Sequence, residues 1–173
     1  MSRSGYSDDC DGWALIRWRG AVTSAIRGKR GQAVLREIVE ALDALPEKTL
    51  AANSLVSADV EFCTLGALGR ARGMDMTRID PDDRDSVASA FEVAEALAAE
   101  IMYLNDEIVA DEWVYVNVEI CGPMRGYERH MQLRSKPNER AGQQRFEQMR
   151  KWVTAHIKVM PTAHTAPAAH PAA

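Results

Sequence analysis

Arginine and lysine side chains gather in three short segments of the sequence, and each could bind an anionic group. The segments contribute Arg27, Lys29 and Arg30, then Arg70 and Arg72, then Arg125 and Arg129 with Tyr127 between them. Guanidinium and ammonium groups bind carboxylates and phosphates, and an aromatic ring beside them stacks on a nucleobase. The sequence therefore predicts that these residues bind another macromolecule, either a protein or a nucleic acid.

A second interpretation of the first segment is a solvated helix face, because Glu37, Glu40 and Asp43 follow closely and could balance its charge. The turn from Gly28 to Gly31 superficially resembles a phosphate-binding loop. It lacks the spacing of such a loop and no buried strand precedes it, so we predict no nucleotide site.

Catalytic and metal-binding patterns are missing from the sequence. No GxSxG or HExxH motif occurs, and the four histidines have no partner at a useful spacing. Counted from Asp8 or from Asp80, the twelfth position of a calcium loop holds Arg19 or Phe91 in place of a bidentate glutamate. We therefore predict no catalytic residue, no metal and no cofactor, and an enzyme with an unrecognised site remains a third hypothesis.

Composition limits the class of protein. The 173 residues suffice for one domain with its own core. Asp and Glu outnumber Lys and Arg by 25 to 21, and the net charge of −4 argues against a protein that coats nucleic acid over its whole surface. No apolar run approaches the ~18 residues of a membrane span, so no membrane partner is predicted.

Cysteine usage and the first residues favour a cytoplasmic location. Cys10, Cys63 and Cys121 are odd in number and form no CxxC pair. The first 13 residues lack the apolar centre of a signal peptide. Free thiols are typical of the reducing cytosol. Cys63 and Cys121 lie in apolar runs, so we expect both of them in the core.

Amphipathic helices must position the basic segments. Apolar residues recur with helical spacing over 13–27, 32–45, 85–105 and from about 139 onward, and a short helix is predicted over 65–71. The first two helices are joined by the turn at 28–31 and should form an antiparallel hairpin. Asp85 or Ser86 is the expected cap of the third long helix.

Strand patterns are fewer. A weak hairpin is predicted over 49–56 and 60–65, and a clear alternation over 113–121 predicts a strand that pairs with 129–134. The expected fold class is α+β and predominantly helical, with the helices around one core and short antiparallel strands beside it. We expect an extended acidic arm over 1–12, one globular domain over 13–160 with a hairpin insertion at 108–138, and a disordered Ala/Pro tail over 161–173.

Six stretches together resemble a family of small uncharacterised proteins encoded by bacteriophages and prophages. They are SGYSDD (4–9), WRGAVTSAIRGKRGQAVLRE (18–37), ALDALPEK (41–48), CTLGALGRARGMD (63–75), AEALAAEIMYLNDE (94–107) and RFEQMRKWVTAHI (145–157). The resemblance covers most of the chain outside 108–138 and the tail. It implies a phage origin, life in the cytoplasm of an infected bacterium and an accessory role, and it implies no particular reaction.

Three hypotheses of function follow. The first is a non-enzymatic phage accessory protein that binds a host or phage protein and modulates it, an anti-CRISPR inhibitor being one concrete form. The second is a nucleic-acid-binding phage factor that uses the basic segments. The third is the enzyme with an unrecognised site.

Overall fold

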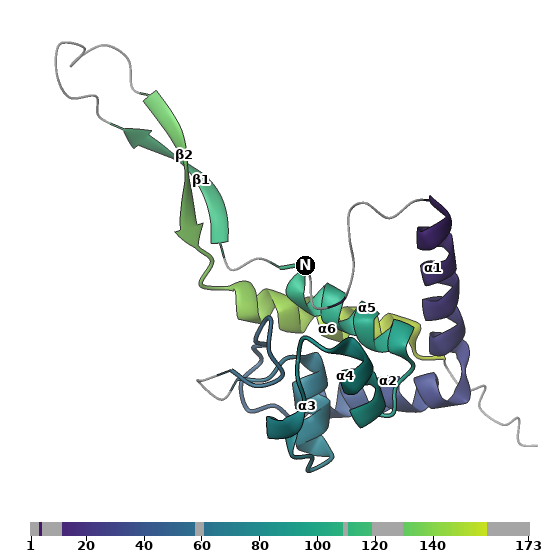
Figure 1. Ribbon diagram of the computed structural model, residues 1–173. Helices are drawn as coiled ribbons and strands as arrows, with labels where there is room; N and C mark the ends of the chain where they lie inside the picture. Colours follow the sequence, from purple (N-terminus) through teal and green to yellow (C-terminus); the bar gives the residue numbers. More distant parts are fainter. Residues whose placement is uncertain (1–3, 5–11, 58–60, 109–110, 119–129, 159–173) are drawn as a thin grey trace, which may run out of the picture.

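The structure is a computed structural model that describes residue 4 and residues 12–57, 61–108, 111–118 and 130–158 (Figure 1). Helices dominate the described residues, and the only sheet among them is a two-stranded ribbon. In order, the elements are α1 Gly12–Arg27, α2 Lys29–Asp43, α3 Thr64–Ala71, η1 Met76–Arg78, α4 Arg84–Ala90, α5 Glu95–Asp106, β1 Asp111–Val118, β2 His130–Pro137 and α6 Ala141–His156. The predicted α+β, predominantly helical class is confirmed.

Helices α1 and α2 meet at a corner and do not lie side by side (Figure 1). Only Gly28 separates them, in place of the predicted four-residue turn. Gly31, in the first turn of α2, lies so close to α1 that an added Cβ would stand 2.0 Å from the carbonyl oxygen of Ala25. The connection is therefore too short for a hairpin, and a glycine makes the close approach of the two backbones possible.

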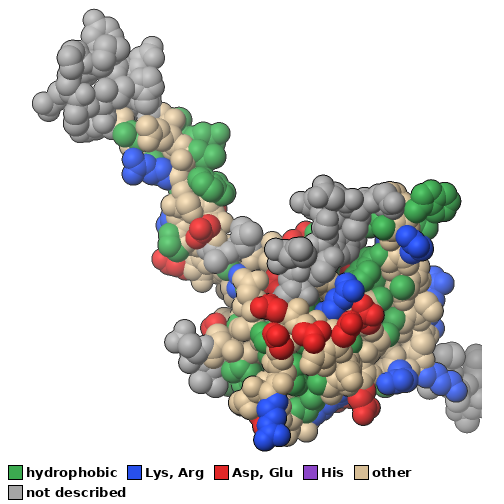
Figure 2. Space-filling model, in the orientation of Figure 1, with side chains coloured by type: hydrophobic (Ala, Val, Ile, Leu, Met, Phe, Trp, Pro, Cys, Tyr) green, Lys and Arg blue, Asp and Glu red, His purple; other side chains and the backbone are tan. Residues whose placement is uncertain are grey.

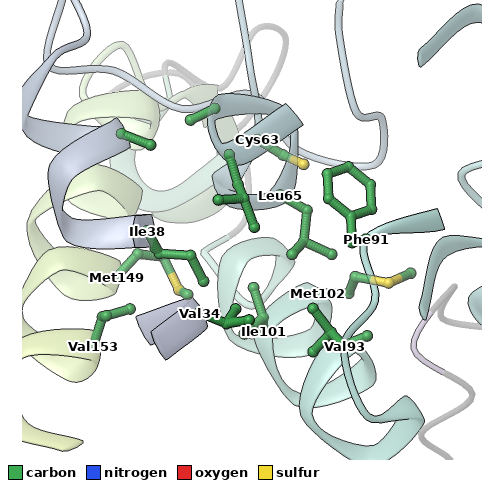
Figure 3. Close-up of a cluster of buried hydrophobic side chains, with 14 of the residues drawn as sticks. Val34, Ile38, Cys63, Leu65, Phe91, Val93, Ile101, Met102, Met149 and Val153 are labelled. Atoms are coloured by element: carbon green, nitrogen blue, oxygen red, sulfur yellow. The ribbon is translucent and has the colours of Figure 1, made fainter. Parts of the chain in front are cut away.

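The core is built around α2, which contacts α1, α3 and α6. Leu35, Ile38 and Leu42 recur along one face of α2 and are fully buried. Side chains from α3, α5 and α6 close over them, among them Leu65, Ile101 and Met149 in the cluster of Figure 3. Cys63 is buried in the same cluster, as predicted, and its sulfur accepts a hydrogen bond from the Gly66 amide at the start of α3.

The helix predicted over 85–105 is in fact two helices, α4 and α5. Glu92 adopts a positive φ of 53°, its amide donates to the Ser89 carbonyl, and the Val93 amide donates to the Ala88 carbonyl. These two bonds are the helix-ending pattern that usually requires a glycine at the position of Glu92. The break turns both Phe91 and Val93 into the core, which a straight helix could not do.

Local caps and turns also differ from the predictions. Asp83, and neither Asp85 nor Ser86, caps α4, because its carboxylate accepts bonds from the amides of those two residues. The predicted hairpin over 49–56 and 60–65 is reduced to a single bridge between Val56 and Phe62 within the described residues. The helix predicted over 65–71 is confirmed as α3.

Strands β1 and β2 form an antiparallel ribbon that projects from the helical body (Figure 1). The predicted strand pair is confirmed, and β2 continues past the expected end at Arg134 to Pro137. Arg145 of α6 holds the chain just before β1, since its Nη2 and Nε donate to the Ile108 carbonyl at 2.7 and 3.1 Å. Burial lowers the pKa of the Arg145 guanidinium, and the carboxylates of Asp106 and Glu61 oppose that shift.

Several predictions concern residues outside the described ranges. These are the acidic arm apart from Ser4 and Gly12, the Ala/Pro tail, Cys10 and Cys121. Ser4 itself is fully buried.

Candidate functional site

Two of the predicted binding residues have structural partners. Arg72 forms an ion pair with Glu37 at 2.7 Å and donates to the Phe91 carbonyl at 2.7 Å. Arg30 donates to the Glu92 carbonyl at 3.1 Å. Both arginines therefore hold the break between α4 and α5, where a helix end exposes carbonyl groups that need donors. Arg72 is thus paired with a carboxylate, whereas Arg30 is exposed and bonds only a carbonyl. The binding role of both residues stays a prediction.

Arg70 lies apart from the first basic segment. Its guanidinium stacks over the Phe62 ring, 5.2 Å from the ring centroid, beside the bridge between Val56 and Phe62. Arg125, Tyr127 and Arg129 lie outside the described residues. The structure therefore does not place the three predicted segments on one surface.

Two cations of the first predicted segment come together with two others where α1, α2 and α6 meet, and we call this group the basic corner. Its members are Arg27, Lys29, Arg36 and Lys158. Lys158 Nζ donates to the Arg27 carbonyl at 2.9 Å, and Arg36 Nη2 donates to the Lys158 carbonyl at 3.4 Å. Two helix C-termini thus meet the N-terminus of α2 at this place.

Gln32 links the two helix ends that form the basic corner. Its side chain is buried, and its amide nitrogen donates to the carbonyls of Ile26 and His156, both at 2.9 Å. Its amide oxygen accepts from the Lys158 backbone amide at 2.7 Å. One glutamine therefore satisfies three backbone groups from two helix ends that are more than a hundred residues apart in the sequence.

No carboxylate of the described ranges neutralises the charge of the basic corner. Arg27, Lys29 and Lys158 are exposed and Arg36 is half-buried. Within the described part of the chain, none of the four cations forms an ion pair with a carboxylate. Their bonds to carbonyl oxygens leave the positive charge intact. Figure 2 shows lysine and arginine side chains grouped where α1 and α2 meet.

An aromatic groove of about 760 Å³ lies beside the basic corner, between α1, α5 and α6. It is lined by the half-buried rings of Trp18, Tyr103, Trp152 and His156, with Glu100 among them and Arg19 and Arg27 at its rim. Trp18 Nε1 donates to Glu100 Oε2 at 3.0 Å, and the Trp152 and His156 rings lie 4.6 Å apart. Arg27 belongs to both features, so the groove and the corner form one continuous surface.

The described ranges contain no cluster of three histidine, cysteine or acidic side chains that could hold a metal ion. None of the helices in these ranges is both long and apolar enough to cross a membrane. Comparison with protein-family models, with curated proteins and with solved structures finds no match to this chain.

The sequence singled out Arg27 and Lys29, whose binding role stays a prediction, and gave no sign that Lys158 and Gln32 join them at the basic corner. Lys158 lies near the tail, 131 residues from Arg27. Gln32 carries no motif, and the one available signal was a polar residue in the apolar stretch of α2. A buried amide at such a position needs hydrogen-bond partners, and those partners lie at the ends of other helices.

Proposed function

We propose that this protein is a non-enzymatic binding protein that docks on an acidic surface of a partner protein and modulates that partner. The observation that supports the proposal is the basic corner, where four cations adjoin an aromatic groove and form no ion pair with any carboxylate that the structure describes. Clustered charge steers a partner of opposite charge, and partly exposed aromatic rings supply contact area at low conformational cost.

The charges around the groove favour a protein partner over a nucleic acid. Glu100 lies inside the groove, where its carboxylate accepts a hydrogen bond from Trp18. A continuous phosphate backbone along the groove would meet this carboxylate, whereas an acidic patch on a protein can end at the basic corner. The net charge of −4 also weakens any general attraction to nucleic acid.

A phage accessory protein in the cytoplasm of an infected bacterium remains the proposed biological setting. The support for it is the resemblance of six sequence stretches to small phage and prophage proteins. Within that setting, an inhibitor of a host defence protein is one concrete form of the proposed docking.

The test is affinity capture from a phage-infected bacterial lysate, followed by reconstitution with the purified captured protein. We expect one dominant protein at near-stoichiometric ratio. Replacing Arg27 and Lys29 with glutamate should weaken its binding by more than about 30-fold, because two steering charges are reversed. The matched control replaces Arg78 and Arg140, exposed arginines elsewhere on the molecule, with glutamate and should leave binding within about threefold. Equal loss in both variants contradicts the assignment of the site.

Binding to single-stranded nucleic acid is the second candidate, because aromatic rings flanked by arginines also stack on bases. It is tested by fluorescence anisotropy with a labelled oligonucleotide at low and high salt. Direct binding should weaken steeply with salt and disappear in the Arg27→Glu/Lys29→Glu variant. No binding at low salt removes this candidate.

A further inference from the structure

The ribbon of β1 and β2 has one face that nothing in the described structure covers. We propose that this face packs against the same face of a second copy of the chain, so that the protein forms a two-fold symmetric dimer through its ribbons. The inference concerns a surface distant from the basic corner and does not depend on the proposed function.

Strand register places four large apolar side chains together on this surface, which we call the open face. Tyr115 is opposite Leu133, and the neighbouring pairs on the same face bring in Trp113 and Met131. The exposed fractions are 64% for Trp113, 68% for Tyr115, 62% for Met131 and 50% for Leu133. A contiguous apolar group of this size is often a functional contact surface, and Figure 2 shows the apolar side chains standing out from the ribbon.

The opposite face of the ribbon differs. It carries Val114 and Val116, which are only half-buried, and the register sets Arg134 opposite Val114 and Gln132 opposite Val116. Long polar side chains cover neighbouring apolar surface with their aliphatic stems while their ends stay in water. This face is therefore already suited to solvent, and only the open face needs a partner.

The area of the open face is close to what a dimer requires. Two of the four side chains are aromatic and two are aliphatic, and at roughly 200 Å² for each large side chain, exposure of half to two-thirds offers about 500 Å². Two such faces together remove about 1,000 Å² from water, which is about the minimum for a specific interface. An isolated two-stranded ribbon is itself only marginally stable, so pairing would also stabilise the strands.

Charge favours a second copy over a charged partner. From Trp113 to Asn117 and from Met131 to Ser135, the open face carries no ionisable acid or base other than the tyrosine hydroxyl. In a two-fold contact the same patch of each copy meets the other. A charged side chain near the symmetry axis would therefore lie against the identical side chain of the second copy. Asp111 lies at the base of the open face, where antiparallel packing of two ribbons separates the two carboxylates. Binding of phosphates would require cations that this face lacks.

The test is sedimentation equilibrium of the full chain from about 1 to about 300 µM, the range in which so small an interface should dissociate. We expect a monomer–dimer equilibrium. Replacing Trp113 and Tyr115 with alanine should raise the dissociation constant of the dimer more than about 100-fold, because each truncation occurs twice. The matched control is Trp13→Ala on α1, where the side chain is 74% exposed, and it should leave the constant unchanged.

Three outcomes overturn the inference. The wild-type chain could remain monomeric at the highest concentration, the ribbon variant could dimerise as well as the wild type, or Trp13→Ala could abolish the dimer. Circular dichroism of the ribbon variant checks that its helices are intact. If the chain is monomeric and the ribbon variant loses a captured partner protein instead, the open face is a site for that other protein.

Discussion

Gln32 illustrates how one buried polar side chain can organise a surface. It bonds three backbone groups at the ends of α1 and α6, and those ends carry Arg27 and Lys158. We predict that Gln32→Met lowers the free energy of unfolding by about 2 kcal/mol, since two carbonyls and one amide lose their buried partner. Urea denaturation measures the change. Gln143→Met, at an exposed position of α6, is the control and should stay within about 0.5 kcal/mol of wild type. Equal effects would show that Gln32 is not structurally special.

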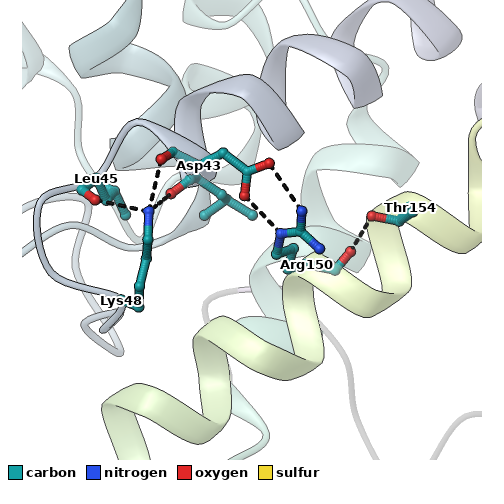
Figure 4. Close-up of polar contacts among 6 residues, drawn as sticks. Asp43, Leu45, Lys48, Arg150 and Thr154 are labelled. Atoms are coloured by element: carbon teal, nitrogen blue, oxygen red, sulfur yellow. Dashed lines mark hydrogen bonds and ion pairs between the residues drawn. The ribbon is translucent and has the colours of Figure 1, made fainter.

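Asp43 and Arg150 join α2 to α6 in a two-pronged ion pair, with Oδ1 to Nε at 2.7 Å and Oδ2 to Nη2 at 3.0 Å (Figure 4). The hydrogen bonds from Arg150 lower the pKa of Asp43 from its ordinary value of 3.8, aided by the charges of Arg150 and Lys48 and opposed by burial. A carboxyl group whose pKa is lower in the folded state stabilises the fold above its unfolded pKa and loses that effect as the pH falls through its folded pKa.

The predicted consequence is a pH-dependent difference between the wild type and Asp43→Asn. At neutral pH the variant should unfold at a lower urea concentration, and the gap should close as the pH falls below the lowered pKa of Asp43. The urea concentration at the midpoint of unfolding, measured for both proteins from about pH 6 to about pH 2, gives this difference in stability. Glu47→Gln removes a nearby exposed carboxylate and should show no such convergence. A constant gap at all pH values would mean that Asp43 acts through packing and not through its charge.

The corner between α1 and α2 depends on the absence of a side chain at Gly31. Gly31→Ala would bring Cβ within 2.0 Å of the Ala25 carbonyl oxygen, so the two helices must move apart. We predict destabilisation by about 1–3 kcal/mol. Gly20→Ala in the middle of α1 is the matched control, because nothing lies within 4 Å of its added Cβ. That variant should stabilise by about 0.5–1 kcal/mol through lower chain entropy. Thermal unfolding should show a lower midpoint temperature for Gly31→Ala and a higher one for Gly20→Ala than for the wild type.

Periodicity predicted most helices because each one buries a single apolar stripe. It failed at Glu92, where the helix ends on a residue that is neither glycine nor proline. The exposed carbonyls of this break are satisfied by Arg72 and Arg30, which are distant in sequence. Of these two arginines, Arg72 also forms an ion pair with Glu37. Charge and glycine spacing show that a loop is basic, but only tertiary contacts decide which cations are already occupied.

At the scale of the whole molecule, the open face and the basic corner lie on different elements, so ribbon dimerisation would leave both corners available. A dimer with two equivalent sites gains avidity on a surface that carries many copies of its partner. Each proposal controls a different measured quantity: the basic corner sets the affinity for the partner in solution, and the open face sets the gain from avidity.

We predict that the Trp113→Ala/Tyr115→Ala variant binds its captured partner protein in dilute solution as tightly as the wild type does. On a sensor surface densely coated with that partner, the variant should dissociate at least about 100-fold faster. At low surface density the two proteins should dissociate at similar rates, because a second site cannot then be reached. The Arg27→Glu/Lys29→Glu variant should lose binding at every density. If the ribbon variant is weakened equally in solution, then the open face contacts the partner directly and the two surfaces are not independent.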